Sequence, residues 1–180
     1  MPKKNLALAS VFFTVFLDIL GVGIVIPVIA PIILHGDGSL LSSGTPEHIK
    51  TLVLGLLIAI YPLAQFVGAP LLGAVSDHIG RRKVLIIVLS ATMIGYFLFA
   101  VALNINSLWL LFFSRAVDGF GGGSIAVAIS AIADISDEES KTRNFGLVGT
   151  AIGLGFILGP TLGGRLSDPS IVPWFWNATP

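Results

Sequence analysis

Five apolar stretches, each long enough to cross a lipid bilayer, dominate this chain of 180 residues. They occupy residues 6–34, 52–76, 84–103, 108–132 and 145–166. A helix needs roughly 20 apolar residues to span the hydrocarbon core. A lipid-exposed segment satisfies its own backbone polar groups only as a helix, and the alternation typical of barrel strands is absent from the sequence. The pattern therefore predicts an all-α membrane protein with five transmembrane helices.

Composition supports lipid as the solvent and excludes several classes of function. The chain is 54% hydrophobic and 11% charged, whereas a soluble domain carries roughly 25% charged residues. The net charge is zero, which gives no reason to expect a nucleic-acid partner. There is no cysteine, and the histidines lie in predicted loops without ligand spacing, so no metal site is expected. No nucleophile–base pair or phosphate-binding loop suggests an enzyme.

The first apolar stretch could belong to a secretory signal peptide, because Lys3 and Lys4 precede it. It is much longer than a signal core, however, and carries Asp18 near its middle. Four similar stretches follow it. We therefore expect the first stretch to be a retained transmembrane helix.

The distribution of basic residues predicts the orientation. Positive residues accumulate on the cytoplasmic side of membrane proteins. A cytoplasmic N-terminus places most of them inside, namely Lys3, Lys4, Arg81, Arg82, Lys83, Lys141 and Arg143. Lys50 and Arg165 lie on the other side. We expect a multi-pass protein of the cell membrane with a cytoplasmic N-terminus, whose aromatic-rich residues 171–177 form an interfacial loop or begin a sixth helix.

Three ionisable residues lie well inside predicted helices, away from their ends, where each costs a few kcal/mol. Asp18 is in the first helix, and Arg115 and Asp118 are in the fourth. At 1.5 Å per residue, Asp18 lies about 18 Å from one membrane surface, while Arg115 and Asp118 lie about 10 and 15 Å from the other. These depths predict that the three side chains approach one another. Arg115 and Asp118, three positions apart, share one helix face.

Two interpretations of these charges remain open. Arg115 and Asp118 can form a purely structural ion pair. Asp18 has no partner on its own helix, so it must meet Arg115, water or a proton. Alternatively, the three residues line a polar pathway and couple protons or substrate to movement. Gln65 is a further candidate in the second helix, either as a hydrogen-bonding pathway residue or in helix packing. The third helix offers only Ser90, Thr92 and Tyr96 as polar groups and is expected to face lipid.

Small residues recur every four positions in the fifth helix, at Gly155, Gly159 and Gly163. This spacing lets another helix backbone approach closely. Pro160 lies within the stripe, where it removes a backbone hydrogen bond and bends the helix. The stripe is interpreted either as close packing or as a hinge.

Several motifs together resemble the major facilitator superfamily. Residues 73–85 resemble the family's loop between its second and third helices, with its characteristic residues at Gly73, Asp77, Gly80, Arg81 and Arg82. Residues 17–31 look like the first-helix signature of its drug:proton antiporters, particularly the tetracycline-efflux type. Residues 115–119 are similar to the fourth-helix element, with Asp118 in place of the family's glutamine. Residues 133–135 and 143–146 resemble the following loop, including Asp134 and Arg143. The fifth-helix antiporter motif is matched at Gly155, Gly159, Pro160, Gly163 and Gly164.

The resemblance implies a fold and roles for these residues. The chain would be a partial N-terminal half of such a transporter, five helices and the possible start of a sixth. Asp77 and Arg81 would belong to a cytoplasmic charge latch with Asp134 as a partner of Arg81. Asp18 and Arg115 would be candidates for proton coupling and substrate handling.

The function expected from the resemblance is proton-coupled efflux of a drug or another hydrophobic small molecule. The proton gradient supplies the energy, and no other cofactor is expected. Expected partners are the lipid bilayer, the substrate, protons and a C-terminal half that this chain lacks. The family places its substrate cavity between two six-helix halves, so the 180 residues alone are not expected to transport. The alternatives are an importer or facilitator of a metabolite, and a truncated or accessory chain without transport activity.

Overall fold

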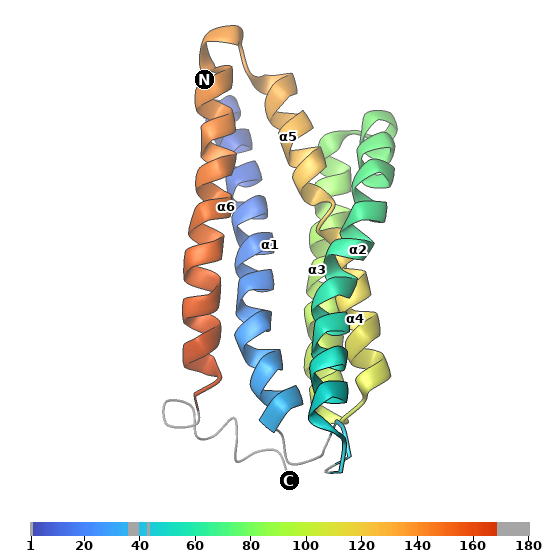
Figure 1. Ribbon diagram of the computed structural model, residues 1–180. Coiled ribbons are helices and arrows are strands. Elements are labelled where there is room, and N and C mark those ends of the chain that lie inside the picture. Colours follow the sequence, from blue (N-terminus) through green and yellow to red (C-terminus); the bar gives the residue numbers. More distant parts are fainter. Residues whose placement is uncertain (1, 36–39, 43, 169–180) are drawn as a thin grey trace.

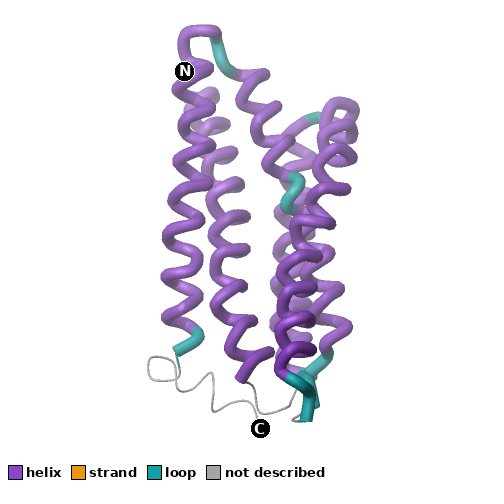
Figure 2. Tube along the Cα trace, in the orientation of Figure 1, coloured by secondary structure: helices purple, strands orange, loops and turns teal. Residues whose placement is uncertain are grey.

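The computed structural model describes residues 2–35, 40–42 and 44–168, and this part of the chain is helical with no strand (Figure 2). The helices are α1 (Pro2–His35), α2 (Glu47–Ile79), α3 (Arg81–Asn104), α4 (Leu108–Gly121), α5 (Ser124–Ile135) and α6 (Glu138–Leu166). Taken together, α4 and α5 form one apolar span, so that five spans are long enough to cross a membrane. The prediction of an all-α membrane protein is confirmed. Residues 171–177, expected to form an interfacial loop or to begin a sixth helix, lie outside the described ranges.

The helices extend beyond the predicted apolar stretches at several ends. α6 starts at Glu138 and not near Phe145, because Glu138 and Glu139 lie in its first turn, where acidic side chains favour the positive end of the helix dipole. α2 likewise starts at Glu47. Hydropathy marks the part of a helix that lies in lipid, and the polar ends continue in helical conformation beyond it.

Residues 77–83, which separate the second and third apolar stretches, do not form a loop of that length, because one residue joins α2 to α3. Gly80 has φ of 94° and ψ of 140°, and its N–H donates to the Ser76 carbonyl oxygen at 3.1 Å. Glycine adopts a positive φ readily because it has no Cβ. The chain therefore reverses at Gly80, which places Asp77 in the last turn of α2 and Arg81 at the start of α3.

The fourth apolar stretch is also not one continuous helix. It is interrupted at Gly122 and Gly123, between α4 and α5. Both glycines pack against α2: a methyl group on Gly123 would lie 2.8 Å from the Ala69 nitrogen. The Gln65 side-chain nitrogen donates to the Gly122 carbonyl oxygen at 2.8 Å. Glycine weakens a helix, and the amide of Gln65 satisfies a carbonyl group freed by the interruption.

The spans pack as two groups connected by α5 (Figure 1). α1 lies along α6, whereas α2 and α3 both pack against α4, and α5 contacts α1, α2 and α3. Along the α1–α6 contact, a methyl group on Gly159 would lie 2.7 Å from the Leu20 carbonyl oxygen and 2.8 Å from the Gly23 Cα. Small residues therefore bring the two backbones into direct contact, as the glycine stripe predicted.

The third span has one exposed apolar side, which fits the expectation that it faces lipid, and one side that packs into the bundle. One side of α3 exposes large apolar residues such as Met93 and Phe97. The opposite side packs against α4, where a methyl group on Gly95 would lie 2.9 Å from the Asp118 Cβ. Thr92 is buried on that side. Thr92 thus points into the bundle, whereas the larger apolar residues of α3 form its exposed side.

Two apolar clusters stabilise opposite ends of the bundle. One contains Val15 and Ile19 of α1 with Ala128 and Ile132 of α5 and Ala151 of α6. The other is formed by Val25, Ile29, Ile33, Leu57, Phe99, Ala102 and Leu111. Asp18 is next to Ile19 of the first cluster, and Arg115 and Asp118 lie between Leu111 of the second cluster and Ala128 of the first along the chain.

Candidate functional site

A group of buried polar side chains occupies the middle of the bundle. We call it the polar centre, and it consists of Asp18, Tyr61, Thr92, Tyr96, Arg115, Asp118 and Ser124. Asp18, Arg115 and Asp118 are only 2%, 3% and 1% exposed. The polar centre draws on α1, α2, α3, α4 and α5, so its geometry depends on how these helices pack.

Arg115 and Asp118 form a buried ion pair on one face of α4. The Arg115 Nη1 lies 2.5 Å from the Asp118 Oδ2. The guanidinium carbon of Arg115 also lies 5.0 Å from the centre of the Tyr61 ring, within the range of a cation–π contact. The predicted sharing of a helix face is therefore confirmed. Pairing is what makes burial of these two charges tolerable, because an unpaired buried charge is very costly.

Asp18 has a partner that the sequence did not reveal. The Ser124 hydroxyl donates to the Asp18 Oδ2 at 2.9 Å, from the first residue of α5. The expected partners were Arg115, water or a proton, and Arg115 is close enough to influence Asp18 electrostatically. The sequence predicts one continuous fourth helix, and in such a helix Ser124 would not differ from its neighbours. The run of three glycines directly before it is the signal in the sequence that could have indicated its special position.

Several polar atoms of the polar centre have no hydrogen-bond partner within the described residues. They are Asp18 Oδ1, Asp118 Oδ1, Tyr61 OH, Thr92 Oγ1 and Tyr96 OH. Buried polar groups in proteins are usually partnered. The site contains two carboxyl groups and one guanidinium group, so it carries a net charge of −1 when both acids are ionised. It can therefore accept a proton or another positively charged group.

Gln65 lies beside a second feature, a cavity of about 400 Å³ lined mainly by α1 and α2, with fewer residues from α4, α5 and α6. Tyr61, Gln65 and Arg115 supply its polar lining, and Ile19 and Phe156 are among its apolar residues. Because the Gln65 amide also bonds the Gly122 carbonyl group, Gln65 takes part in helix packing and also borders a cavity. Both interpretations made from the sequence fit its position.

A second charged cluster lies at the end of the bundle where α2 meets α3, and we call it the Arg81 cluster. The Arg81 Nη2 lies 2.6 Å from the Asp77 Oδ1, and its Nε donates to the Asp134 Oδ2 at 3.1 Å. Its Nη1 donates to the Ser76 hydroxyl, which in turn donates to the Gly73 carbonyl oxygen at 2.6 Å. Arg81, at the start of α3, thus binds Asp77 of α2 and Asp134 of α5, which are the two expected acidic partners. Its role as a latch stays a prediction.

The remaining motif residues are distributed as follows. Arg82 and Arg143 are exposed. A methyl group on Gly155 would lie 2.8 Å from the Ile19 Cγ2, and one on Gly163 would lie 2.7 Å from the Pro27 Cγ, whereas Gly164 faces open space. A methyl group on Gly23 of α1 would lie 2.8 Å from the Pro160 Cδ. These contacts support the close-packing interpretation of the stripe, and its use as a hinge stays a prediction.

Within residues 2–35, 40–42 and 44–168, no group of three or more potential metal ligands occurs.

Comparison with known proteins places these features in a family. The family model of the Major Facilitator Superfamily matches residues 11–178. The class C tetracycline resistance protein of Escherichia coli is 40% identical over 172 residues, which cover 94% of this chain and 40% of that protein. The quinolone resistance protein NorA of Staphylococcus aureus is 35% identical over 167 residues, which cover 92% of this chain and 39% of that protein.

The chain therefore spans about 40% of the length of these relatives. The matched family consists of membrane transporters and not of enzymes, and the apolar helices make this a multi-pass membrane protein. Because the match extends over nearly the whole chain, the chain belongs to the Major Facilitator Superfamily.

Proposed function

We propose that this chain is part of a secondary transporter that exports a hydrophobic small molecule in exchange for protons. The observation that carries the proposal is the polar centre, in which Asp18 lies buried beside the Arg115–Asp118 ion pair. Ionisable groups at such a depth are costly and are functional candidates by default. The names of the relatives, which refer to tetracycline and quinolone resistance, support a drug-like substrate.

The polar centre has the parts that proton coupling requires. Asp18 can change its charge by one unit on taking up a proton, and its Oδ1 has no protein partner within the described residues. Arg115 does not form a direct ion pair with Asp18, but it is close enough to attract the Asp18 carboxylate. A proton on Asp18 would remove this attraction, because the neutral carboxyl group no longer carries the negative charge on which it depends. Arg115 would respond through its contacts with Asp118 and Tyr61.

The cavity of about 400 Å³ beside Gln65 and Arg115 is our candidate for one wall of the transport pathway. It combines a mostly apolar lining with a few polar groups, which is typical of sites for hydrophobic ligands. Ile152 and Phe156 of α6 and Ile58 of α2 supply apolar surface there. In this proposal, the other wall comes from the C-terminal half of a longer transporter, and the present chain is most of the N-terminal half.

The Arg81 cluster would stabilise one conformation of the transporter on the cytoplasmic side, with the N-terminus of the chain on that same side. A single exposed ion pair contributes only about 0–1 kcal/mol. Arg81, however, contacts Asp77, Asp134 and Ser76 together, and its side chain is only 24% exposed. Multiple contacts of one partly buried guanidinium group make a stronger connection than a surface pair. The positive charges at this end support a cytoplasmic N-terminus in the cell membrane.

The test is drug susceptibility of bacteria that express the complete reading frame. Resistance to a hydrophobic antibiotic is expected with the unchanged sequence and is expected to disappear with Asp18→Asn. Addition of an uncoupler should abolish the resistance, because it collapses the proton gradient. Resistance that survives the uncoupler would exclude the antiport mechanism, and uptake in place of export would favour the importer alternative.

The second candidate is a chain without transport activity of its own. The observation in its favour is that the chain spans about 40% of its relatives. We expect the purified 180-residue chain in proteoliposomes to show no saturable, gradient-driven flux. Such flux would show that the second half is dispensable.

A further inference from the structure

The short helix α5 is bound by polar contacts at both of its ends. At one end, the Ser124 hydroxyl donates to the Asp18 Oδ2 of α1 at 2.9 Å. At the other end, the Arg81 Nε of α3 donates to the Asp134 Oδ2 at 3.1 Å. At 1.5 Å per residue, Ser124 and Asp134 lie about 15 Å apart along the helix. α5 therefore connects the polar centre with the Arg81 cluster.

α5 is joined to α4 by a segment that differs from a regular α-helix. The Gly123 N–H donates to the Phe120 carbonyl oxygen at 3.3 Å, and the Ala126 N–H donates to the Gly123 carbonyl oxygen at 3.2 Å. Both bonds connect residues three apart, as in a 3₁₀-helix, and not four apart as in an α-helix. A 3₁₀ segment within a longer helical span often marks a hinge, and glycine changes its backbone angles at little steric cost. We call residues 121–123 the glycine joint.

The two sides of the glycine joint are held very differently. α4 packs closely along α2 and α3, whereas α5 touches each of its neighbours less extensively. The joint itself is fixed against α2, since a methyl group on Gly123 would lie 2.8 Å from the Ala69 nitrogen. Ala128 and Ala131 of α5 pack in one apolar cluster with residues of α1 and α6. Because their side chains are single methyl groups, this packing holds α5 less firmly than large side chains would. α4 is therefore the fixed side, and α5 is the side that can tilt.

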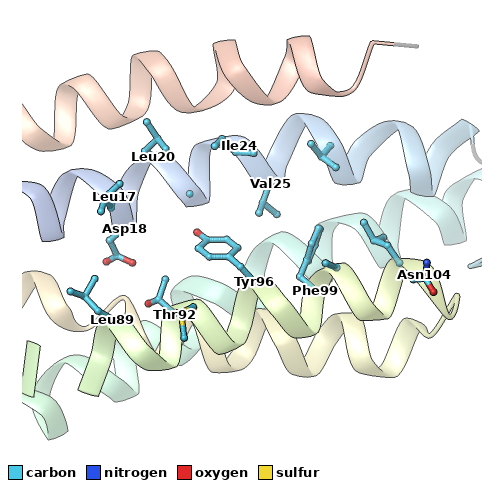
Figure 3. A pocket seen from close by; sticks show the side chains of 15 residues that line it. Leu17, Asp18, Leu20, Ile24, Val25, Leu89, Thr92, Tyr96, Phe99 and Asn104 are labelled. Carbon is cyan, nitrogen blue, oxygen red and sulfur yellow. The ribbon is translucent and has the colours of Figure 1, made fainter. Parts of the chain in front are cut away.

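The two helices that bind the ends of α5 contact each other little. A cavity of about 690 Å³ lies between residues 17–28 of α1 and residues 89–104 of α3. Figure 3 shows Asp18 pointing from α1 toward the side of α3 that carries Thr92 and Tyr96. α5, by contrast, packs against both α1 and α3. A displacement at Asp18 therefore reaches Arg81 mainly through α5.

We propose that α5 tilts as one rigid segment about the glycine joint, so that the Ser124–Asp18 hydrogen bond and the Arg81–Asp134 ion pair form and break together. The hydrogen bonds within α5 keep its two ends in a fixed relation. Loss of the contact at one end then lowers the cost of opening at the other, and this coupling acts in both directions. The inference goes beyond the proposed function, since it assigns a connecting role to α5 and requires neither protons nor a substrate.

The experiment uses the purified 180-residue chain in detergent, and this chain contains no cysteine. A single introduced cysteine can therefore report opening at a chosen position. The reporter is Ala131→Cys, at a position of α5 that is 7% exposed and lies one helical turn before Asp134. Its reaction with N-ethylmaleimide is followed at low reagent concentration, where the rate is proportional to the population of the open state. Each rate is divided by that of the same variant unfolded in sodium dodecyl sulfate.

The perturbation is Ser124→Ala, which removes the bond to Asp18 without weakening α5 itself, because alanine favours helices. If α5 is rigid, its far end opens only when this bond breaks. Its removal should then raise the reaction rate of Ala131→Cys by about three- to fifteenfold, the factor for one hydrogen bond between membrane helices. The matched control is Ser114→Ala in α4, where the buried hydroxyl donates to the Leu111 carbonyl oxygen of its own helix at 2.7 Å. It should leave the rate within about twofold.

The reverse direction is measured with a cysteine nearer to the glycine joint, Ala128→Cys, at a position that is 0% exposed. Asp134→Asn weakens the contact of Arg81 with α5 and should raise the reaction rate of this cysteine by about two- to fivefold. Asp77→Asn weakens the contact of Arg81 with α2 and should leave the rate nearly unchanged. The two aspartates are similarly exposed, at 58% and 61%, so the comparison is matched. Equal effects of the two variants would contradict a connection through α5.

Three further results would overturn the proposal. An unchanged rate for Ala131→Cys in the presence of Ser124→Ala would show that the two ends of α5 open independently. An equal increase caused by Ser114→Ala would show that loss of any buried hydroxyl loosens the bundle. An equal increase at Ala102→Cys of α3, a position that is 0% exposed in the other apolar cluster, would mean that the whole chain opens more readily. Transport is measured in none of these experiments, so the proposed function keeps its own test.

Discussion

The contact between α1 and α6 predicts opposite effects for the same substitution at two glycines of α6. A methyl group on Gly159 would lie 2.7 Å from the Leu20 carbonyl oxygen and 2.8 Å from the Gly23 Cα. Both contacts are with backbone atoms, which cannot rotate away. Gly153 lies on the exposed side of the same helix, and a methyl group there would meet no atom within 4 Å.

The expected magnitudes follow from these distances. Ordinary van der Waals contacts lie near about 3.5 Å, so Gly159→Ala must separate the two backbones by about 0.8 Å. Overpacking of this kind costs about 1–3 kcal/mol. Gly153→Ala has no such penalty and should stabilise the helix by about 0.5–1 kcal/mol, because alanine loses less backbone freedom on folding. The two variants should therefore differ in sign.

The assay is unfolding of the purified chain in mixed micelles with increasing mole fraction of sodium dodecyl sulfate, followed by the far-ultraviolet circular dichroism of the helices. The midpoint should fall for Gly159→Ala and rise slightly for Gly153→Ala. If Gly159→Ala is as stable as the unchanged chain, the two helices are not in backbone contact and the packing argument is refuted. If both variants are destabilised equally, the loss of stability arises within helix α6 and not from its contact with α1.

Four further predictions concern the turn and the polar centre. Gly80→Ala should lower the free energy of unfolding by about 1–3 kcal/mol, measured in the same assay, because a side chain is strained at φ of 94° and ψ of 140°. Arg115→Gln should cost about 3–5 kcal/mol by leaving the Asp118 charge without its partner. The double variant with Asp118→Asn should recover much of this loss, and failure to recover would argue against direct coupling of the pair. Ser124→Ala should cost about 0.6–1.7 kcal/mol, the range for hydrogen bonds between membrane helices, whereas Ser124→Thr should retain most of the stability. In the complete reading frame, Asp18→Asn should abolish proton-linked transport measured in inverted vesicles, and unchanged transport would contradict its role.

The spans and the ion pair on α4 were accessible from the sequence because both depend on local rules. The length of an apolar stretch determines whether it crosses the bilayer. Arg115 and Asp118 are three residues apart, which places them on one face of any helix. The spacing of Gly155, Gly159 and Gly163 similarly indicates a close helix contact from the sequence alone. In each of these cases, the relevant geometry lies within a single helix.

The features that the sequence did not reveal depend on contacts between helices. Ser124 meets Asp18 only because α4 and α5 separate at Gly122 and Gly123, and this separation is favoured by packing against α2. Tyr96 faces α1 because of the rotation of α3 about its axis, which is determined by its contact with α4. The short turn at Gly80 was hidden because its charged neighbours suggested a loop. The mean hydropathy of a span does not define the rotation of its helix, so these details follow from the packing of the folded bundle.

The separation of Asp18 from Ser124 by 106 residues has a consequence for biogenesis. Helices enter the membrane in the order of synthesis, so α1 reaches the bilayer well before α5 exists. During that interval, Asp18 must be accommodated by water at the translocon, by a proton, or by delayed release of α1 into lipid. The first span therefore completes its polar contacts only when the second half of the fourth span has been inserted, and assembly of the bundle core is late compared with insertion of its first helix.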